Sequence, residues 1–187
     1  MNEYEADDGL ATGARRFRDQ VEQVRILTPD KDLGQCLRGD RVVQVDRRQR
    51  KLIDESRFRA ERGFGPQSMP DFLALTGDSA DGFPGLPGFG KKAASLLIGA
   101  YEHLEKIPAD VNRWKVKPRG APQLAATLIE HRSHALLYRR LATLVDTLEL
   151  DCSLVDLEFR GVPRRDFEEW CDRLGAVGLK TAPRRWR

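Results

Sequence analysis

Several hallmarks of common protein classes are missing from this chain of 187 residues. Cysteine occurs three times, at Cys36, Cys152 and Cys171, and the three are far apart without a CxxC pair. That spacing argues against a disulfide framework and against a thiolate zinc site. No apolar run approaches the roughly 18–20 residues that a membrane span needs, and the acidic N-terminus lacks the apolar segment of a secretory signal. We therefore expect a reduced, cytoplasmic protein with no membrane partner.

The chain also lacks a large excess of positive or negative charge, and its formal net charge is only +3. An excess of this size is weak evidence for a nucleic-acid partner. The distribution of charge says more, since acids gather near the N-terminus while seven bases between residues 113 and 140 face a single acid, Glu130. Two interpretations are open: a solvated basic helix with a frayed tail, or a phosphate-facing surface beside a carboxylate cluster. The second is what a metal-dependent nuclease needs.

Apolar periodicity predicts an α/β part followed by a helical part. Leu10, Ala14, Phe17 and Val21 have helical spacing, and apolar runs at 24–27, 42–45 and 51–53 predict strands. The last two runs are expected to pair as a hairpin. Beyond residue 54 the pattern predicts helices over 55–62, 71–75, 91–101, 124–130, 135–148 and 164–174.

A glycine-rich loop lies between two of these predicted helices. Four glycines and two prolines occupy the nine residues from Gly82 to Gly90. The segment from Gly85 onward nearly matches the phosphate-binding pattern G-x-x-x-x-G-K-[ST]. Lys92 stands where that pattern requires Ser or Thr, and no strand precedes the loop, so nucleotide binding is disfavoured.

The loop is better interpreted as the hairpin of a helix–hairpin–helix unit. Gly88 and Gly90 are expected to allow positive φ and a close approach of the backbone to a ligand. Free N–H groups at the start of the next helix form an anion site, and Lys91 and Lys92 add charge for phosphate. Such a hairpin holds a DNA backbone without reading its sequence. The alternative is a plain glycine-rich turn.

Carboxylates form three groups at points where the chain changes direction. The groups are Glu5, Asp7 and Asp8; Asp30 and Asp32; and Asp78 and Asp81. Seven carboxylates brought together repel one another unless cations neutralise them, and hard oxygen ligands suit Mg²⁺ or Mn²⁺. Two such ions activate water for phosphodiester hydrolysis. Taken singly, each group is more simply explained as a helix cap or a surface turn.

Three segments together resemble one enzyme family. They are Tyr4-Glu5-Ala6-Asp7-Asp8, Thr28-Pro29-Asp30-Lys31-Asp32-Leu33, and the stretch from Leu75 through Gly90 that includes Asp78, Asp81 and the glycine-rich loop. In this order and spacing they are similar to the 5′→3′ exonuclease family, which includes the flap endonucleases and the 5′-nuclease domain of bacterial DNA polymerase I. The resemblance runs from about Tyr4 to Leu104 and more loosely to about Leu148.

The resemblance implies a fold class and a domain division. The expected class is α/β, a partial PIN-like or resolvase-like Rossmannoid sheet, followed by an all-α helix–hairpin–helix region. Residues 1–65 are expected to be the C-terminal part of the α/β 5′-nuclease domain. Residues 66–187 are expected to be a helical DNA-binding region with a basic tail.

The resemblance also implies an activity, its cofactors and its site residues. The expected activity is metal-dependent 5′→3′ exonuclease or structure-specific 5′-flap endonuclease action on DNA with 5′ ends, flaps or nicks, by two-metal-ion hydrolysis with Mg²⁺ or Mn²⁺. Glu5, Asp7 and Asp8 would serve the first ion, and Asp30, Asp32, Asp78 and Asp81 would act catalytically, mainly through the second. Gly85, Gly88, Gly90, Lys91 and Lys92 would bind DNA, with hairpin carbonyls holding K⁺.

The sequence lacks a block that precedes the first motif in the family. That block carries a strand with a metal-binding Asp and a basic helical arch. The alternative function is therefore a catalytically incomplete, structure-specific DNA-binding fragment, with the missing block supplied by a separate chain. A phosphatase of the haloacid dehalogenase kind is a third, weaker candidate, because Thr28-Pro29 separates Asp30 from the strand. Cleavage that depends on Asp30 and Asp78 separates nuclease from binding fragment.

Overall fold

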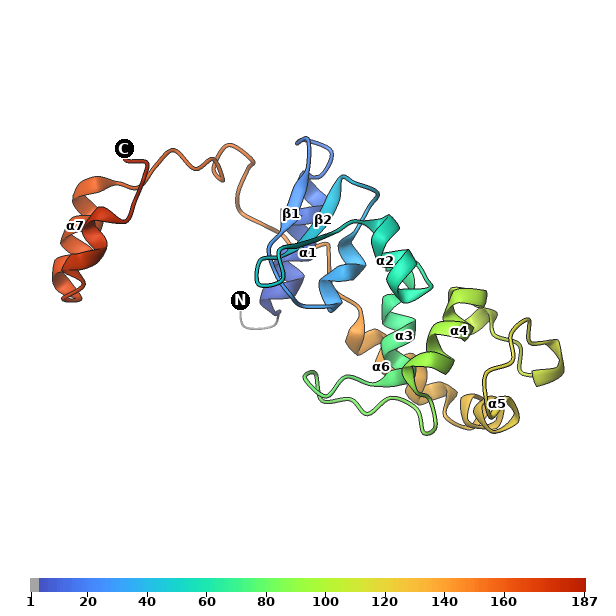
Figure 1. Cartoon of the computed structure of the whole chain (residues 1–187). Coiled ribbons are helices and arrows are strands. Elements are labelled where there is room, and N and C mark those ends of the chain that lie inside the picture. Colours follow the sequence, from blue (N-terminus) through green and yellow to red (C-terminus); the bar gives the residue numbers. More distant parts are fainter. Residues whose placement is uncertain (1–3) are drawn as a thin grey trace. The chain divides into compact units, whose positions relative to one another are not determined.

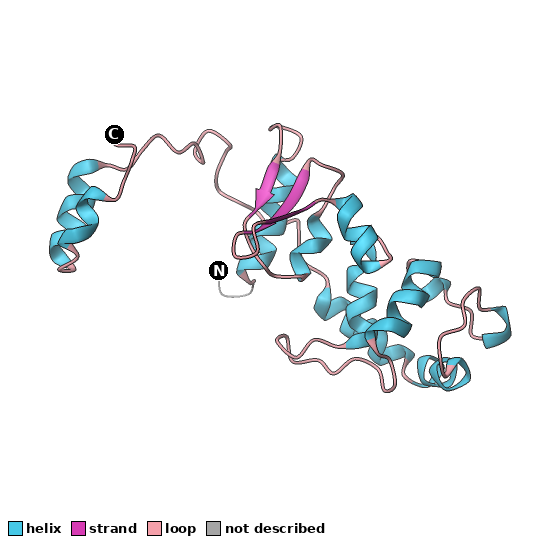
Figure 2. Ribbon diagram, in the orientation of Figure 1, coloured by secondary structure: helices cyan, strands magenta, loops and turns pink. Residues whose placement is uncertain are grey.

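The computed structural model describes residues 4–187 and divides the chain into two compact units, Met1–Leu150 and Asp151–Arg187. Figure 1 follows the chain through both units, and Figure 2 shows that the strands are confined to a short early stretch of a mainly helical protein. None of the helices within residues 4–187 is long and apolar enough to cross a membrane.

The sheet has three strands in the order β1-β2-β3. Strand β1 (Val24–Ile26) pairs in parallel with β2 (Val42–Asp46), and β2 pairs antiparallel with β3 (Lys51–Ile53). The turn between β2 and β3 is closed by Asp46, whose Oδ1 accepts the backbone N–H groups of Arg48 (2.8 Å) and Gln49 (3.0 Å). The predicted strands and hairpin are therefore confirmed.

Helix α1 (Ala6–Phe17) packs against β1 and buries Ala11, Ala14 and Phe17. Its first turn is capped by Asp8, whose carboxylate accepts the backbone N–H of Glu5 at 3.1 Å. The predicted apolar face was partly wrong, because Leu10 is 46% exposed and Val21 lies beyond the end of the helix. The small alanines face the sheet instead, since they allow the helix to approach it closely.

Five helices make up the rest of the first unit. They are α2 (Glu55–Arg62), α3 (Met69–Thr76), α4 (Lys91–Tyr101), α5 (Ala121–Glu130) and α6 (Arg132–Ala142). Helix α2 starts where the Asp54 carboxylate accepts the Arg57 N–H (2.7 Å) and ends at Gly63, where φ is +81°. The larger apolar core joins all five helices, and α3 lies between α4 and α6 (Figure 1).

The helix predicted over 135–148 ends earlier, at Ala142. The chain from 143 to 150 has no regular secondary structure and lies along α1. There the Val145 N–H donates to Asp8 Oδ1 at 2.8 Å, and the Leu148 N–H donates to Thr12 Oγ1 at 3.2 Å. These side chains of α1 replace the helical hydrogen bonds, so tertiary contacts override the local helical periodicity.

A buried acid holds the helical part together. Asp71 on α3 is 2% exposed, and its carboxylate accepts hydrogen bonds from the Leu104 N–H (3.1 Å) and Arg139 on α6 (3.1 Å), while His103 Nδ1 lies 3.0 Å away. Arg139 also pairs with Glu105 at 2.6 Å. The hydrogen bond from Arg139 is the main cause that lowers the pKa of Glu105 to about 2.

The second unit is built on α7 (Arg164–Arg173). The C-terminal segment returns to the start of this helix, where the Val162 N–H donates to the Arg185 carbonyl (2.9 Å) and the Arg187 N–H donates to the Val162 carbonyl (3.0 Å). The ring of Trp186 lies 5.9 Å from that of Phe167. The basic tail is thus held in place and not frayed.

Candidate metal and DNA site

The loop after β1 places Asp30 and Asp32. Gln44 on β2 is almost fully buried, and its amide donates to the carbonyls of Thr28 (3.0 Å) and Asp30 (2.5 Å). The Asp30 carboxylate in turn accepts the Asp32 N–H at 3.0 Å. Asp32 therefore starts a 3₁₀ helix (Asp32–Cys36) with its side chain directed inward and only 8% exposed.

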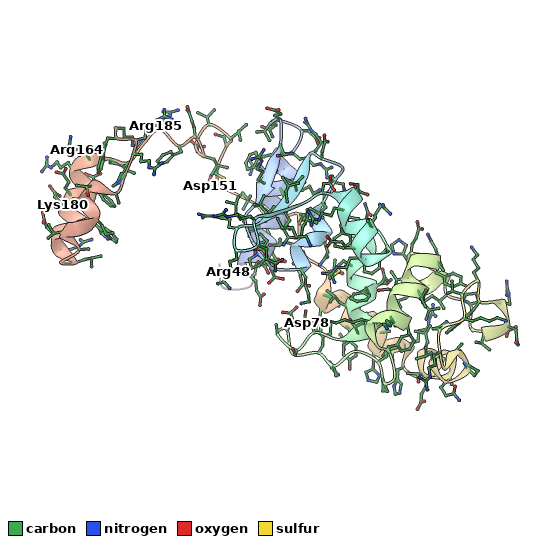
Figure 3. All side chains as sticks on the ribbon, in the orientation of Figure 1. Arg48, Asp78, Asp151, Arg164, Lys180 and Arg185 are labelled. Carbon is green, nitrogen blue, oxygen red and sulfur yellow. The ribbon has the colours of Figure 1, made fainter. Side chains whose placement is uncertain are left out.

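The loop after α3 places Asp78 and Asp81. Asp78 forms a short antiparallel bridge with Phe83, with N–H to carbonyl distances of 2.9 and 3.1 Å, and its carboxylate accepts the Ala80 N–H at 3.0 Å. Asp78 is 6% exposed, whereas Asp81 lies exposed in the turn. Figure 3 labels Asp78 at the start of this loop.

These two loops bring three carboxylates together. Asp32, Asp78 and Asp81 each offer an oxygen within 4.8 Å of the others, and among residues 4–187 this is the one group of three or more potential ligands so arranged. Oδ1 of Asp32 is buried without a hydrogen-bond partner. Burial, opposed by Lys31 but reinforced by Asp30, raises the pKa of Asp32 to about 6.

Lys31 is a member of the site that sequence reasoning missed. Its Nζ donates to the Asp78 carboxylate and lies 3.5 Å from Asp32 Oδ1. Burial acts to raise the pKa of Asp78, but the hydrogen bonds from Lys31 and Ala80 outweigh it and leave that pKa below its usual value. The signal was partial: a lysine next to Asp32 is placed to balance that acid, but spacing does not show its contact with Asp78, 47 residues away.

The first acid group lines the same cavity as Asp32 and Asp81 without joining the compact cluster, and the predicted ligand Asp30 does not join that cluster either. Glu5, Asp7, Asp8, Asp32 and Asp81 all line a cavity of about 640 Å³. Burial is the largest cause that raises the pKa of Asp7, and the negative charges of Asp30 and Glu5 raise it further. Asp8 has both carboxylate oxygens engaged with backbone N–H groups, so it has a structural role as well.

The cavity also has a basic wall. Arg140 on α6 lines it together with residues 141–145 and the carboxylates. The sequence predicts Arg140 only as part of a broad basic segment. Its place beside the acids follows from the packing of α6 on α3, which cannot be read from spacing alone.

The hairpin is built on two interlocked glycines. Gly77 ends α3 with φ +75°, and Gly85 has φ +72°. A Cβ on Gly85 would overlap the Gly77 nitrogen and come within 2.5 Å of the Thr76 carbonyl carbon, and a Cβ on Gly77 would overlap Pro84. The loop therefore closes on itself only because neither residue has a side chain.

The expectation for the other two hairpin glycines was half right. Gly88 has φ +80°, as predicted. Gly90 does not have positive φ: at −90° it is the extended residue before α4, because the chain must straighten there to start the helix. Lys91 and Lys92 begin α4, both exposed, and neither forms an ion pair within the described chain.

The arrangement fits a hard divalent cation. Three carboxylates from two loops converge, and one buried oxygen lacks the hydrogen bond that buried polar atoms almost always have. Mg²⁺ and Mn²⁺ favour such oxygen ligands. The Lys31 ammonium alone balances only part of the charge of Asp32 and Asp78.

Family models match almost the whole chain. Residues 1–63 match the model of the 5'-3' exonuclease N-terminal resolvase-like domain, and residues 64–165 match that of the 5'-3' exonuclease C-terminal SAM fold.

Curated relatives agree with these matches. DNA polymerase I of Pseudomonas aeruginosa is 36% identical over 182 residues, covering 91% of this chain and 20% of the polymerase. A 5'-3' exonuclease of Aquifex aeolicus is 30% identical over 178 residues, covering 95% of this chain and 57% of the relative. The flap endonuclease Xni of Vibrio parahaemolyticus is 34% identical over 158 residues, covering 84% and 57%. The chain thus spans less than two thirds of each relative.

Solved structures support the fold. The bacteriophage T5 flap endonuclease, in a pseudo-enzyme–product complex with DNA and metal ions, matches with a TM-score of 0.63 at 16% identity. The T5 5'-exonuclease with bound zinc matches with a TM-score of 0.64 at 17% identity. These alignments cover 76% of this chain and 50% and 51% of the phage chains. The expected α/β fold with a helical region is confirmed, and the chain belongs to the 5′→3′ exonuclease family.

Proposed function

We propose that this chain acts in metal-dependent 5′→3′ exonuclease or 5′-flap endonuclease cleavage of DNA. The observation that carries the proposal is the compact group of Asp32, Asp78 and Asp81, in which one buried carboxylate oxygen has no hydrogen-bond partner. Relatives named 5'-3' exonuclease and flap endonuclease support the same activity.

The acids divide between two ions in this proposal. Asp32, Asp78 and Asp81 hold the better-formed site, with Asp30 orienting Asp32 through its N–H. Glu5, Asp7 and Asp8 face the same cavity and serve the other of the two ions. Divalent ions such as Mg²⁺ or Mn²⁺ polarise a phosphodiester and lower the pKa of water. Lys31 balances part of the charge of Asp78 and Asp32 in the metal-free protein.

The hairpin positions the DNA in this scheme. The exposed Lys91 and Lys92, and the free N–H groups at the start of α4, contact phosphates without regard to base sequence. Hairpin carbonyls around Gly85 and Gly88 hold K⁺. Residues 1–65 then form the α/β part of the nuclease and residues 66–187 the DNA-binding part. The substrates are DNA 5′ ends, flaps and nicks.

Cleavage of a 5′-labelled flap duplex in Mg²⁺ or Mn²⁺ tests the proposal. Asp81→Asn removes a ligand from an exposed turn, so the protein is expected to fold while cleavage falls about a hundredfold, since even indirect partners of a metal cost 10–100-fold. Asp40→Asn, an exposed acid outside the cavity, is the matched control and is expected to cleave normally. Equal cleavage by both variants would remove the metal site from the mechanism.

A second candidate is a DNA-binding fragment that a separate chain completes. Two observations favour it: within residues 4–187 only one group of three carboxylates is compact, and β1 pairs with β2 on one side alone. This candidate predicts tight flap binding, equal in EDTA and Mg²⁺, with no cleavage by the wild-type chain.

A further inference from the structure

A second cavity lies beside the hairpin, outside the carboxylate cluster. It measures about 530 Å³ and is bounded by the loop Pro84–Gly88 and by three side chains: His131, the residue just before α6, and His134 and Tyr138 within α6. None of these three side chains entered the expected site. The cavity therefore adds a surface next to the segment proposed to hold DNA.

The three rings form one continuous series that begins at the residue before α6 and continues along that helix. The ring centroids of His131 and His134 are 5.7 Å apart, and those of His134 and Tyr138 are 6.2 Å apart. Tyr138 in turn stacks on Phe83 of the loop at 5.8 Å, and Phe83 is 3% exposed. The series is therefore anchored in the core at one end and reaches the cavity at the other.

The imidazoles have hydrogen-bonding capacity that the described chain does not use. No hydrogen bond within residues 4–187 involves a ring nitrogen of His131 or His134, whereas His103 Nδ1 lies 3.0 Å from the Asp71 carboxylate. The nearest charge to His131 is the carboxylate of Glu130, 3.9 Å from Nε2 and largely exposed.

The opposite wall has no charged side chain. The loop residues Pro84, Gly85, Leu86, Pro87 and Gly88 have no ionisable side chain, and Tyr138 is the one other titratable group that lines the cavity. Lys91 and Lys92 follow the loop in the sequence but do not line the cavity. A ligand of this cavity therefore meets two imidazoles, a phenol and the loop backbone.

We propose that this cavity binds a phosphodiester group of the DNA strand held by the hairpin, with the imidazole N–H groups of His131 and His134 as donors. This inference rests on the proposed DNA-binding function of the hairpin. A neutral imidazole donates one hydrogen bond, and its protonated form donates two and carries a charge that the phosphate complements. Binding and protonation of the two rings therefore favour each other.

Acidification is accordingly expected to strengthen DNA binding. Histidine is the side chain whose charge ordinarily changes between pH 5 and pH 8. Two exposed ion pairs of ordinary strength together tighten binding about tenfold between pH 8.0 and pH 5.5. They also make the slope of the logarithm of the binding constant against the logarithm of the salt concentration steeper by up to about two units.

Fluorescence anisotropy of a labelled flap duplex in EDTA tests this with the full chain. The wild type is expected to bind about tenfold more tightly at pH 5.5 than at pH 8.0. The double variant His131→Gln with His134→Gln keeps polar side chains but cannot gain charge, so most of this gain should vanish while affinity at pH 8.0 changes little. The variant His103→Gln is the matched control, because it removes the one other histidine, and it should retain the gain.

Retention of the full pH dependence by the double variant would overturn the proposal, as would its loss in His103→Gln alone. Chemical shifts of the three imidazoles give a reading that needs no variant. Adding DNA should raise the pKa of two histidines and leave that of the third unchanged. Failure of the hairpin itself is distinguishable, since Lys91→Ala with Lys92→Ala would then leave affinity unchanged at every pH.

Discussion

At the scale of single residues, Asp32 shows how burial opposes the negative charge of a carboxylate. Its carboxylate is nearly inaccessible, one oxygen lacks a hydrogen bond, and three further carboxylates stand nearby. In the metal-free protein this charge is unfavourable, and Lys31 relieves it only in part. In the proposed function, a divalent cation would supply the missing partner.

Replacement of Asp32 by Asn tests this balance through stability. The folded-state pKa is about 6, above the value near 3.9 in an unfolded chain, so the folded state binds the extra proton between these values. Ionisation of Asp32 therefore lowers the free energy of unfolding as pH rises through this window. In EDTA we expect Asp32→Asn to match the wild type at pH 4 and to exceed it by up to about 3 kcal/mol at pH 7.

The thermal stability of the wild type and of Asp32→Asn should also respond differently to Mg²⁺. Mg²⁺ is expected to raise the Tm of the wild type at pH 7 and to leave that of Asp32→Asn unchanged, because the variant lacks one ligand. Thermal denaturation with and without Mg²⁺ measures both effects. A wild-type response to Mg²⁺ in the variant would contradict the ligand role.

At the scale of elements, the hairpin after α3 depends on close backbone approach. Gly85 and Gly82 share nearly the same positive φ, +72° and +77°, but differ in their surroundings. A Cβ on Gly85 would overlap the backbone of Thr76 and Gly77, whereas a Cβ on Gly82 would meet nothing within 4 Å.

These two glycines form a matched pair for mutation. Gly82→Ala is expected to cost about 1 kcal/mol, the strain of positive φ alone. Gly85→Ala should cost at least about 2 kcal/mol more, because the backbone must move, and should also weaken duplex binding. Chemical denaturation and anisotropy measure the two effects. An equal loss of stability in the two variants would show that the backbone around Gly85 accommodates a Cβ without a further loss of stability.

The contact between α3 and α6 depends on a buried charge network. Arg139→Leu would leave the Asp71 carboxylate, 2% exposed, without its guanidinium partner. We expect a loss of about 3 kcal/mol in the free energy of unfolding. Arg132→Leu, at the exposed start of α6, is the control and should cost less than about 0.5 kcal/mol. A small loss in Arg139→Leu would mean that His103 and the Leu104 N–H suffice.

At the scale of the whole molecule, the two compact units differ in the contacts that stabilise each of them. The first has an extended core that joins α2 through α6. The second, Asp151–Arg187, buries Cys171 within α7 and ties its C-terminal segment back through Val162 and Trp186. The family models reach residue 165, so they end just inside α7.

Much of this protein followed from the sequence by itself. Local patterns are sufficient for the strands, for most helices and for the glycine loop, because periodicity and turn chemistry act over a few residues. The three acid groups, in their order and spacing, also led to the family that the comparisons show. The metal and DNA-binding roles of individual residues stay predictions.

Only the tertiary structure decided which side chains meet. The sequence could not separate the compact group of Asp32, Asp78 and Asp81 from Asp8, whose oxygens are used by backbone N–H groups. Nor could it place Lys31 on Asp78, 47 residues away, or end α6 at Ala142. Such contacts join segments that are distant in the chain, and the packing of helices and loops in three dimensions determines them.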